Sequence, residues 1–600
     1  YLALRELRNS LPVDLQQELT STSTLLNGHA VDYEATVTFK LAFARKVFNL
    51  FGAETLESAE FQAWAAEQQE WLQPYAAFCY IKDLLQTAEH WRWGTLAGPA
   101  GPATVARIVD PKADHHRAIQ FTYYLQWHLH RQLLSVTAHA EKSRVVLQGD
   151  LPIGVDKRSA DTWTAPNLFN MDKSTGAPPD VFGPEGQNWG FPTYNWNEMA
   201  KDNYSWWCKR LQHLGQYFHA YRIDHVLGFF RIWEIPGDCA TGLLGCFKPS
   251  IPIWRHELVD RGMGDEGAIA RLVDPYIRAH LLVSAFGKAW QEVAAKYLVE
   301  HGDGCYKFRP QYSTEQNIAD IKVRHDSPHW LVEETDRTRK ALLTLRQNVL
   351  LLADEEDQDK FYPRFQLKST SSFRELDARW RDNLSWLYDD YFFRRQDDLW
   401  RASALKKLPA LMAASDMLVC GEDLGMVPSC VAPVMQELGL VGMRIQRMSG
   451  EEGHEFANPA NYPYLVVASP SCHDVAPTRA WYEEDAERRD RFFFGTLGGC
   501  GEAPALCTTD VMRAVAHQHL ASPCVWTVFP IQELMALCSR YHNRPATDEI
   551  INDPTTNKHY WRFRVHASME ELQADTQLVG AVQELLLITG RTSPEELPPL

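Results

Sequence analysis

The stretch AYRIDHVLG at residues 220–228 decides the fold class of this 600-residue chain. It is a short apolar run that ends in charged residues, as in a buried parallel strand whose carboxyl end reaches a polar site. Helical stretches such as VPSCVAPVMQELG lie between runs of this kind, so we expect an α/β protein with a parallel sheet. Charged residues at the strand ends predict an α/β barrel with its site at the top. The five other runs are VVLQGDLPIG (145–154), MLVCGEDLG (417–425), GMRIQRM (442–448), YLVVASPSCHD (464–474) and VWTVFPIQ (525–532).

The spacing of the six runs predicts a (β/α)8 barrel that lacks its first strands here and carries a large insertion. A plain barrel needs roughly 31 residues per strand–helix unit, whereas Ile223 and Val419 are 196 residues apart. We therefore expect an insertion of unknown role over 247–397, between two parts of a catalytic barrel at 1–246 and 398–600. The two missing strands are either weak strands in the first 140 residues or lie upstream of Tyr1, and we favour the second interpretation.

The first 140 residues have the pattern of a helical subdomain. FQAWAAEQQEWLQPYAAFCYIKDLLQTA and IQFTYYLQWHLHRQLLSVTAHA both show helical spacing of apolar residues. His128 and His130 lie two residues apart on the second expected helix, so they face apart and are not expected to share a metal.

Composition limits the function classes. The formal net charge of −17 argues against nucleic acid and anionic membranes as partners, and no apolar run reaches the length of a transmembrane helix. The twelve cysteines are scattered without a CxxC pair, as is typical of reduced thiols in a cytosolic enzyme. We find no phosphate-binding, dinucleotide or metal-binding motif, so we expect no cofactor and no metal. The 20 tryptophans include candidates for stacking on sugars.

Three carboxylates follow three of the expected strands: Asp224, Glu422 and Asp474. Side chains alternate along a strand, so Arg222 and Asp224 are expected to point the same way and the guanidinium to keep the pKa of Asp224 low. An ionised aspartate suits a glycosidase nucleophile, and a desolvated Glu422 with a raised pKa suits a proton donor. Asp474 could hold substrate hydroxyls. Each carboxylate alone could instead satisfy backbone N–H groups, but three at successive strand ends favour a catalytic site.

A segment rich in Gly, Pro, Asn and aromatic residues, 149–196, supports this interpretation. It follows an expected strand, so we expect a long ordered loop at the top of the barrel. Trp189 could stack on a sugar, while Asp161, Gln187 and Asn188 could bind hydroxyl groups. A rigid lid without ligand contact is the competing interpretation.

Several motifs together resemble the 4-α-glucanotransferases of glycoside hydrolase family 77, the amylomaltases and disproportionating enzymes. The resemblance covers about three-quarters of the chain, and the insertion is similar to that of the plant and green-algal cytosolic members. It implies Asp224 as nucleophile, Glu422 as acid/base and Asp474 as transition-state stabiliser. It also implies that Arg222, His225, His473 and Asn552 contact sugar. The motifs are GDLPIGV…SADTW, APPD…GQNWG, RIDHVLGFFRIWEIP, GEDLG, CHD…TRAWY and NDPTTNKHYW.

The resemblance further implies retaining transfer from maltose or malto-oligosaccharides to a branched glucan or heteroglycan, in starch and maltose metabolism. A plain α-glucan hydrolase would use the same three carboxylates, and a third interpretation is an inactive glucan-binding fragment. Two departures from the family lie beside the expected site: Cys472 replaces a usual threonine, and Val475 replaces an asparagine that is common in bacterial relatives. The family's first strands have no counterpart in this sequence, which suggests a fragment. The oligomeric state is not predicted.

Overall fold

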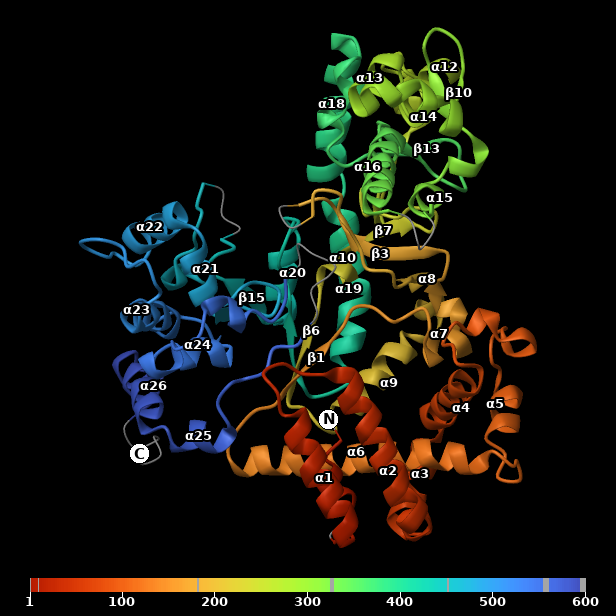
Figure 1. Cartoon of the computed structure of the whole chain (residues 1–600). Helices are drawn as coiled ribbons and strands as arrows, with labels where there is room; N and C mark the ends of the chain where they lie inside the picture. The colour runs from red at the N-terminus through yellow and green to blue at the C-terminus, as the bar shows by residue number, and fades with distance from the viewer. Residues whose placement is uncertain are drawn as a thin grey trace.

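The computed structural model describes residues 2–8, 10–180, 183–323, 328–449, 453–553 and 561–593. The strands that hold the expected carboxylates lie near the middle of the molecule, with the amino-terminal helices below them (Figure 1). The segment 247–397 rises above them, and the carboxyl-terminal helices lie to one side (Figure 1). In the described part of the chain, no helix is both long enough and apolar enough to cross a membrane.

All six expected strands are present and pair in parallel. Two three-stranded sheets have the orders β1-β6-β14 and β15-β16-β17, and a parallel bridge between Cys420 and Val441 links them. The α/β class is therefore confirmed. Among the described residues β1 and β17 do not pair with each other, so these strands form an open series and not a closed barrel. The strands are β1 (Gln148–Leu151), β6 (Ala220–Ile223), β14 (Leu418–Gly421), β15 (Gly442–Ile445), β16 (Val466–Ser469) and β17 (Trp526–Thr527).

The described part of residues 2–142 contains helices and no strand, as the spacing of its apolar residues predicted. The long helix α6 buries Phe121, Tyr124 and Trp127 in one core and Ile119 in another, because apolar residues recur at helical spacing. These side chains pack against α2, α3 and α4 in apolar cores separate from that of the strands. The helices are α1 (Val13–Leu26), α2 (Tyr33–Leu56), α3 (Ala59–Glu67), α4 (Gln69–Leu85), α5 (Pro102–Ile108) and α6 (His116–Lys142).

The segment 149–196 contains more regular structure than the long loop we expected. Its strands β3 and β4 join β7 and β8 in an antiparallel sheet of order β4-β3-β7-β8, and β2 pairs with β5. The strands are short and their partner β7 lies about 60 residues further along the chain, which explains why local sequence patterns miss them. Their bounds are β2 (Phe169–Asn170), β3 (Lys173–Ala177), β4 (Gln187–Asn188), β5 (Thr193–Tyr194), β7 (Ile232–Pro236) and β8 (Cys246–Lys248). The adjoining helices are α7 (Ala160–Thr164), α8 (Trp196–Met199), α9 (Ser205–Leu214) and α10 (Leu227–Phe230).

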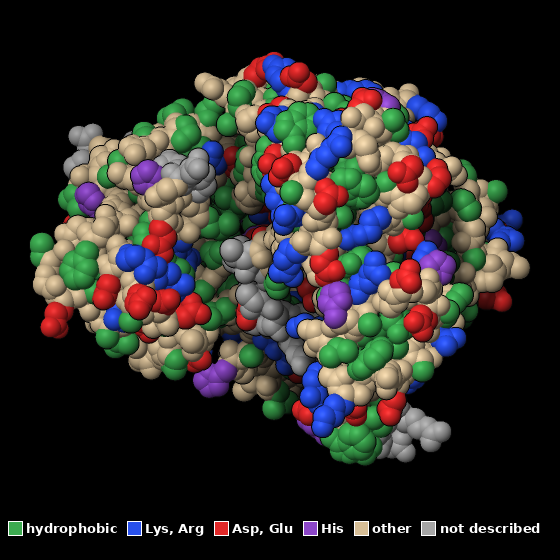
Figure 2. Space-filling view, turned by 90° about the horizontal axis from the view of Figure 1, so that it is seen from above, with side chains coloured by type: hydrophobic (Ala, Val, Ile, Leu, Met, Phe, Trp, Pro, Cys, Tyr) green, Lys and Arg blue, Asp and Glu red, His purple; other side chains and the backbone are tan. Residues whose placement is uncertain are grey.

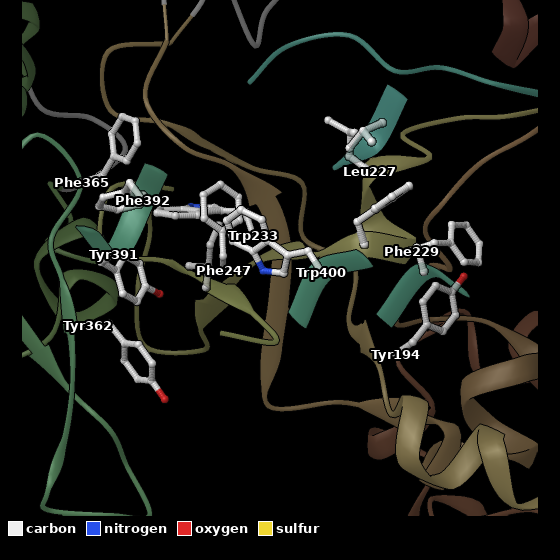
Figure 3. Close-up of a cluster of buried hydrophobic side chains, with 14 of the residues drawn as sticks. Tyr194, Leu227, Phe229, Trp233, Phe247, Tyr362, Phe365, Tyr391, Phe392 and Trp400 are labelled. Carbon is white, nitrogen blue, oxygen red and sulfur yellow. The ribbon is translucent and has the colours of Figure 1, made fainter. Parts of the chain in front are cut away.

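The segment 247–397 is packed onto the strands by an aromatic core. Trp233 lies 4.8 Å from Phe247 and 5.9 Å from Phe365, measured between ring centroids (Figure 3). Phe247 also lies 5.8 Å from Trp400 and 6.3 Å from Phe392. Its strands are β9 (Ile253–Trp254), β10 (Leu298–Glu300), β11 (Tyr306–Phe308), β12 (Leu351–Ala353) and β13 (Lys360–Pro363). Its helices are α11 (Arg255–Val259), α12 (Glu266–Val273), α13 (Ala279–Phe286), α14 (Trp290–Tyr297), α15 (Glu315–Ala319), α16 (His329–Arg346), α17 (Ser371–Arg374) and α18 (Ala378–Phe393).

The remaining helices cover the strands from the carboxyl-terminal part of the chain. Helix α19 packs against α9, α10 and α20, and α23 packs against α26 around a core of its own. The bounds are α19 (Asp397–Met412), α20 (Val431–Leu438), α21 (Thr478–Glu484), α22 (Ala486–Gly495), α23 (Thr509–Leu520), α24 (Ile531–Met535), α25 (Met569–Ala574) and α26 (Thr576–Ile588).

Candidate active site

Two of the expected carboxylates directly follow adjacent parallel strands. Asp224 follows β6 and Glu422 follows β14, and Gly421 lies opposite Ile223 in the register of this pair. The Glu422 N–H donates to the Ile223 carbonyl at 2.9 Å, and the Glu422 carbonyl accepts from the Val226 N–H at 3.0 Å. Because the ends of parallel strands meet at one edge, backbone hydrogen bonds bring these two residues together.

Arg222 connects β6 with β1 at this edge. Its Nη1 lies 3.1 Å from the Asp224 Oδ1, so the prediction that both side chains point the same way is confirmed. The same nitrogen donates to both oxygens of Asp150 at 2.8 and 3.0 Å. Asp150 lies opposite Arg222 on β1. Asp150 is not among the residues predicted from the sequence. Its place near the end of the expected strand in 145–154 was a usable signal that it lies near the site, whereas its pairing with Arg222 depends on the register between strands.

The expected low pKa of Asp224 is wrong. Partial burial raises the pKa of this carboxyl above its ordinary value, and the Arg222 guanidinium only partly opposes that effect. The negative charges of Asp150 and Asp474 raise the pKa of Asp224 further, which also shows that Asp474 lies within electrostatic reach. The prediction failed because it considered one cation and neither the lost water nor the neighbouring acids.

Glu422 has the environment expected of a proton donor. Its side chain is buried, with 9% of the residue exposed, and burial raises its pKa to about 7. Its Oε2 accepts from the backbone N–H of His225 at 2.9 Å, and its Oε1 accepts from that of Leu424 at 2.7 Å. The Glu422 carboxyl therefore lies against the residue that follows Asp224.

His225 joins the carboxylates to the aromatic segment. It has a φ of 51°, which is unusual for a residue with a side chain, and burial lowers its pKa to about 4. Its ring meets the Trp189 ring edge to face at 5.3 Å between centroids. The Trp189 Nε1 donates to Gln187 Oε1 at 2.9 Å. Trp189 and Gln187 therefore lie beside the strand that leads to Asp224.

The third carboxylate lies on the connection after β16. Asp474 is exposed, and its Oδ2 lies 3.3 Å from the His473 Nε2. The His473 ring lies 5.7 Å from that of Trp561, an exposed residue that was not among those predicted from the sequence. An aromatic residue in the segment that also holds Asn552 was a usable signal for a second sugar-stacking candidate.

Two predicted binding residues have no direct link to the carboxylates. Asp161 lies in α7 and accepts a hydrogen bond from the Trp206 Nε1 at 3.1 Å. Asn552 is half-buried in an irregular segment. Among the described residues, neither forms a hydrogen bond or ion pair with Asp224, Glu422 or Asp474. Their roles in sugar binding stay predictions.

The family assignment agrees with this geometry. The model of glycoside hydrolase family 77, described as 4-alpha-glucanotransferase, matches residues 1–570. This chain belongs to glycoside hydrolase family 77. The resemblance found in the sequence motifs is thereby confirmed for nearly the whole chain, with the segment 247–397 inside the match.

Two relatives in family 77 align with almost the whole chain. The 4-alpha-glucanotransferase DPE2 of Oryza sativa subsp. japonica is 47% identical over 595 residues, which are 99% of this chain and 62% of that protein. The 4-alpha-glucanotransferase of Chlamydia pneumoniae is 34% identical over 599 residues, 98% of this chain and 82% of that protein. The chain thus spans about three-fifths of the length of the rice relative.

A solved structure of an amylomaltase shares the fold of this family 77 chain. The amylomaltase from Streptococcus agalactiae in complex with acarbose superposes with a TM-score of 0.59 at 17% identity. The superposition covers 96% of this chain and 85% of that chain. At this identity the likeness shows the fold alone.

Proposed function

We propose that this chain is a 4-α-glucanotransferase that moves a glucosyl or glucan unit to the 4-hydroxyl of an acceptor glucan with retention of configuration. The observation that carries the proposal is the pairing of Asp224 and Glu422 on adjacent strands. The pKa of Glu422 is raised to about 7 by burial, so this carboxyl holds a proton near neutral pH.

In the first step, Glu422 protonates the glycosidic oxygen of the donor and Asp224 attacks the anomeric carbon. The bond to the leaving sugar breaks as the bond to the Asp224 carboxylate forms. Loss of its proton leaves Glu422 ionised and ready to act as a base. Arg222 favours the ionised form of Asp224, which is the nucleophilic form.

In the second step, Glu422 takes the proton from the 4-hydroxyl of the acceptor, whose oxygen then displaces Asp224 from the sugar. Asp474, with His473 beside it, is proposed to hold sugar hydroxyls and stabilise the positively charged ring of the transition state. Trp189, which lies beside His225, is proposed to stack on the sugar. We propose that sugar hydroxyls are also bound by Asp161, Gln187 and Asn552.

We also propose the fold, the substrates and the cellular role that the sequence suggested. The six strands are taken as part of a (β/α)8 barrel divided into 1–246 and 398–600, with 247–397 as an insertion. Likeness to the amylomaltase fold and membership of family 77 support this. We propose maltose or malto-oligosaccharides as donors, a branched glucan or heteroglycan as acceptor, and a cytosolic role in starch and maltose metabolism; identity to the rice relative supports these choices.

The test is to incubate the protein with labelled maltose and glycogen and to measure how much label appears in free glucose and in glycogen. Wild-type protein should release one glucose and move the other onto glycogen, and Asp224→Ala should lower both rates at least about 1,000-fold because no covalent intermediate forms. Asp83→Ala, which removes an exposed carboxylate in the helical subdomain, serves as a matched control and should match wild type. Unchanged label transfer in Asp224→Ala would exclude Asp224 as the nucleophile.

The same assay separates transfer from hydrolysis. Transfer conserves the number of linkages, so reducing ends should stay constant while label enters glycogen. A steady rise in reducing ends without label in glycogen would show a hydrolase. Absence of both products would support an inactive glucan-binding fragment.

A further inference from the structure

A cavity of about 970 Å³ lies outside the candidate active site, between the strands and the segment 247–397. Its walls come from β3, β7 and β8, from residues 346–356, and from α19. Its lining, taken from the described residues, does not include Asp224, Glu422 or Asp474. The volume is at the upper end of the range for small-molecule sites, about 300–1,000 Å³.

A buried amine faces this cavity. Lys407 of α19 is only 3% exposed, and its Nζ lies 4.6 Å from the centroid of the Trp196 ring. It forms no hydrogen bond or ion pair with the residues that the structure describes. Burial lowers the pKa of Lys407 to about 7. The Lys407 amine therefore faces the cavity without an acceptor from the described residues, so an oxygen of a bound ligand can accept a hydrogen bond from it.

Polar groups on the other walls complement this amine. Glu234 of β7 uses Oε2 to accept from the Thr193 hydroxyl at 2.6 Å. The Lys248 Nζ donates to the Tyr362 hydroxyl at 2.8 Å, which donates to Asp354 at 2.6 Å. Tyr362 and Asp354 lie late in the segment 247–397, whereas Lys248 lies at its start on β8, which pairs with β7. Donors and acceptors from the sheet and from the later part of the segment therefore meet in the cavity.

The charges of the residues that line the cavity favour a neutral ligand over an anionic one. Six carboxylates and five cationic side chains line the cavity, so its net charge is close to zero. The lining has no excess of cationic side chains that would attract an anion such as phosphate. Sugar hydroxyls both donate and accept, which matches a wall of alternating carboxylates and amines.

We propose that this cavity is a second, non-catalytic sugar site that binds a neutral disaccharide such as maltose between the strands and the insertion. Lys407 donates to one hydroxyl oxygen, and Glu234 accepts from another. The site goes beyond the proposed reaction because it contains none of the reacting groups. Since α19 leads into β14 and β3 pairs with β4, a sugar here would brace two segments that border Glu422 and Trp189.

The proposal is tested by hydrogen exchange of residues 349–356, a part of the segment 247–397 that lines the cavity. Every protein in this experiment is the 600-residue chain with Asp224→Ala, so that maltose is not consumed. Exchange of residues 349–356 is measured by mass spectrometry with and without maltose, in this parent and with Lys407→Met or Lys82→Met added. Lys82 is an exposed lysine of α4 and provides the matched control. Glu234→Gln is a second variant that keeps the acceptor for Thr193.

Maltose should slow exchange of this segment at least about threefold in the parent and in the Lys82→Met variant. The effect should be lost in Lys407→Met and weakened in Glu234→Gln. No slowing in the parent, or equal slowing in Lys407→Met and Lys82→Met, would overturn the proposal. So would slowing by inorganic phosphate but not by maltose, which would show an anion site. The result is independent of glucose release, so failure of the transferase proposal would leave it standing.

Discussion

Glu422 shows how burial of one residue prepares an acid for catalysis. Its pKa of about 7 arises chiefly from lost hydration, and the hydrogen bonds from Leu424 and His225 oppose that shift. The folded-state pKa is above the ordinary value of 4.5, so the favourable contribution of this group is present below pH 4.5 and lost as the pH rises through 7.

We therefore expect Glu422→Gln to gain stability over wild type as the pH rises. The gain in free energy of unfolding should be near zero at pH 4 and at most about 3 kcal/mol at pH 8, because glutamine removes the buried charge. Denaturant unfolding at several pH values measures it. Over the same range, wild-type kcat/KM should fall above about pH 7 as Glu422 loses its proton.

Glu60→Gln, at an exposed helical position, is the control and should follow wild type at every pH. A stability difference between Glu422→Gln and wild type that does not change with pH would contradict the raised pKa.

Asp150 offers a second prediction at the residue scale. Asp150→Asn removes a negative charge that raises the pKa of Asp224 and frees Arg222 to pair with Asp224 alone. The acid limb of the pH profile of kcat/KM should move to lower pH, and kcat/KM at neutral pH should fall about tenfold as Arg222 shifts. Asp110→Asn, in the helical subdomain, should change neither quantity. An acid limb that stays in place would exclude this electrostatic role.

At the scale of single elements, sequence patterns predicted the strands and helices whose signal lies within a short stretch of the chain. The six parallel strands were found because each is an apolar run with a polar end, and α6 because its apolar face repeats every turn. The sheet β4-β3-β7-β8 was missed because its pairing is long-range. Arg222 was placed correctly by alternation along β6, whereas its partner Asp150 depends on the register between strands, which sequence does not show.

The close approach of β3 and β4 gives a prediction for this sheet. A Cβ at Gly176 would lie 1.9 Å from the Gln187 carbonyl oxygen, so Gly176→Ala must push β4 away from β3. Trp189, which directly follows β4, should then move from His225, and kcat/KM for maltose should fall about tenfold or more. Gly98→Ala, where a Cβ meets open space, is the control. Wild-type kcat/KM in Gly176→Ala would show that the placement of β4 does not matter for catalysis.

At the scale of the whole molecule, acidic and basic side chains are interspersed over the face in Figure 2 despite the net charge of −17. This arrangement suits a neutral polymer as partner, because no extended field of one sign steers the encounter.

The segment 247–397 contributes to two separate hydrophobic cores. Phe247, Phe365 and Phe392 belong to the core of the strands, whereas residues 277–345 enclose a separate core that contains Leu282 and Leu342.

This division predicts which part of the segment can be removed. The Tyr276 N–H donates to the Asn348 carbonyl at 2.9 Å, so the ends of 277–347 lie side by side and a short Gly-rich turn can join them. That deletion should leave a cooperative unfolding transition with a thermal midpoint lowered by several degrees, mainly because Ala240 and Thr241 lose Glu315 as acceptor.

Deletion of the whole of 247–397 should abolish cooperative unfolding, because it removes Phe247 and Phe365, which pack against Trp233 and Trp400. Each such loss costs about 3–5 kcal/mol. Calorimetry of the two deletions beside wild type distinguishes them. A cooperative transition in the larger deletion, or its loss in the smaller one, would show that the boundary between the two cores lies elsewhere.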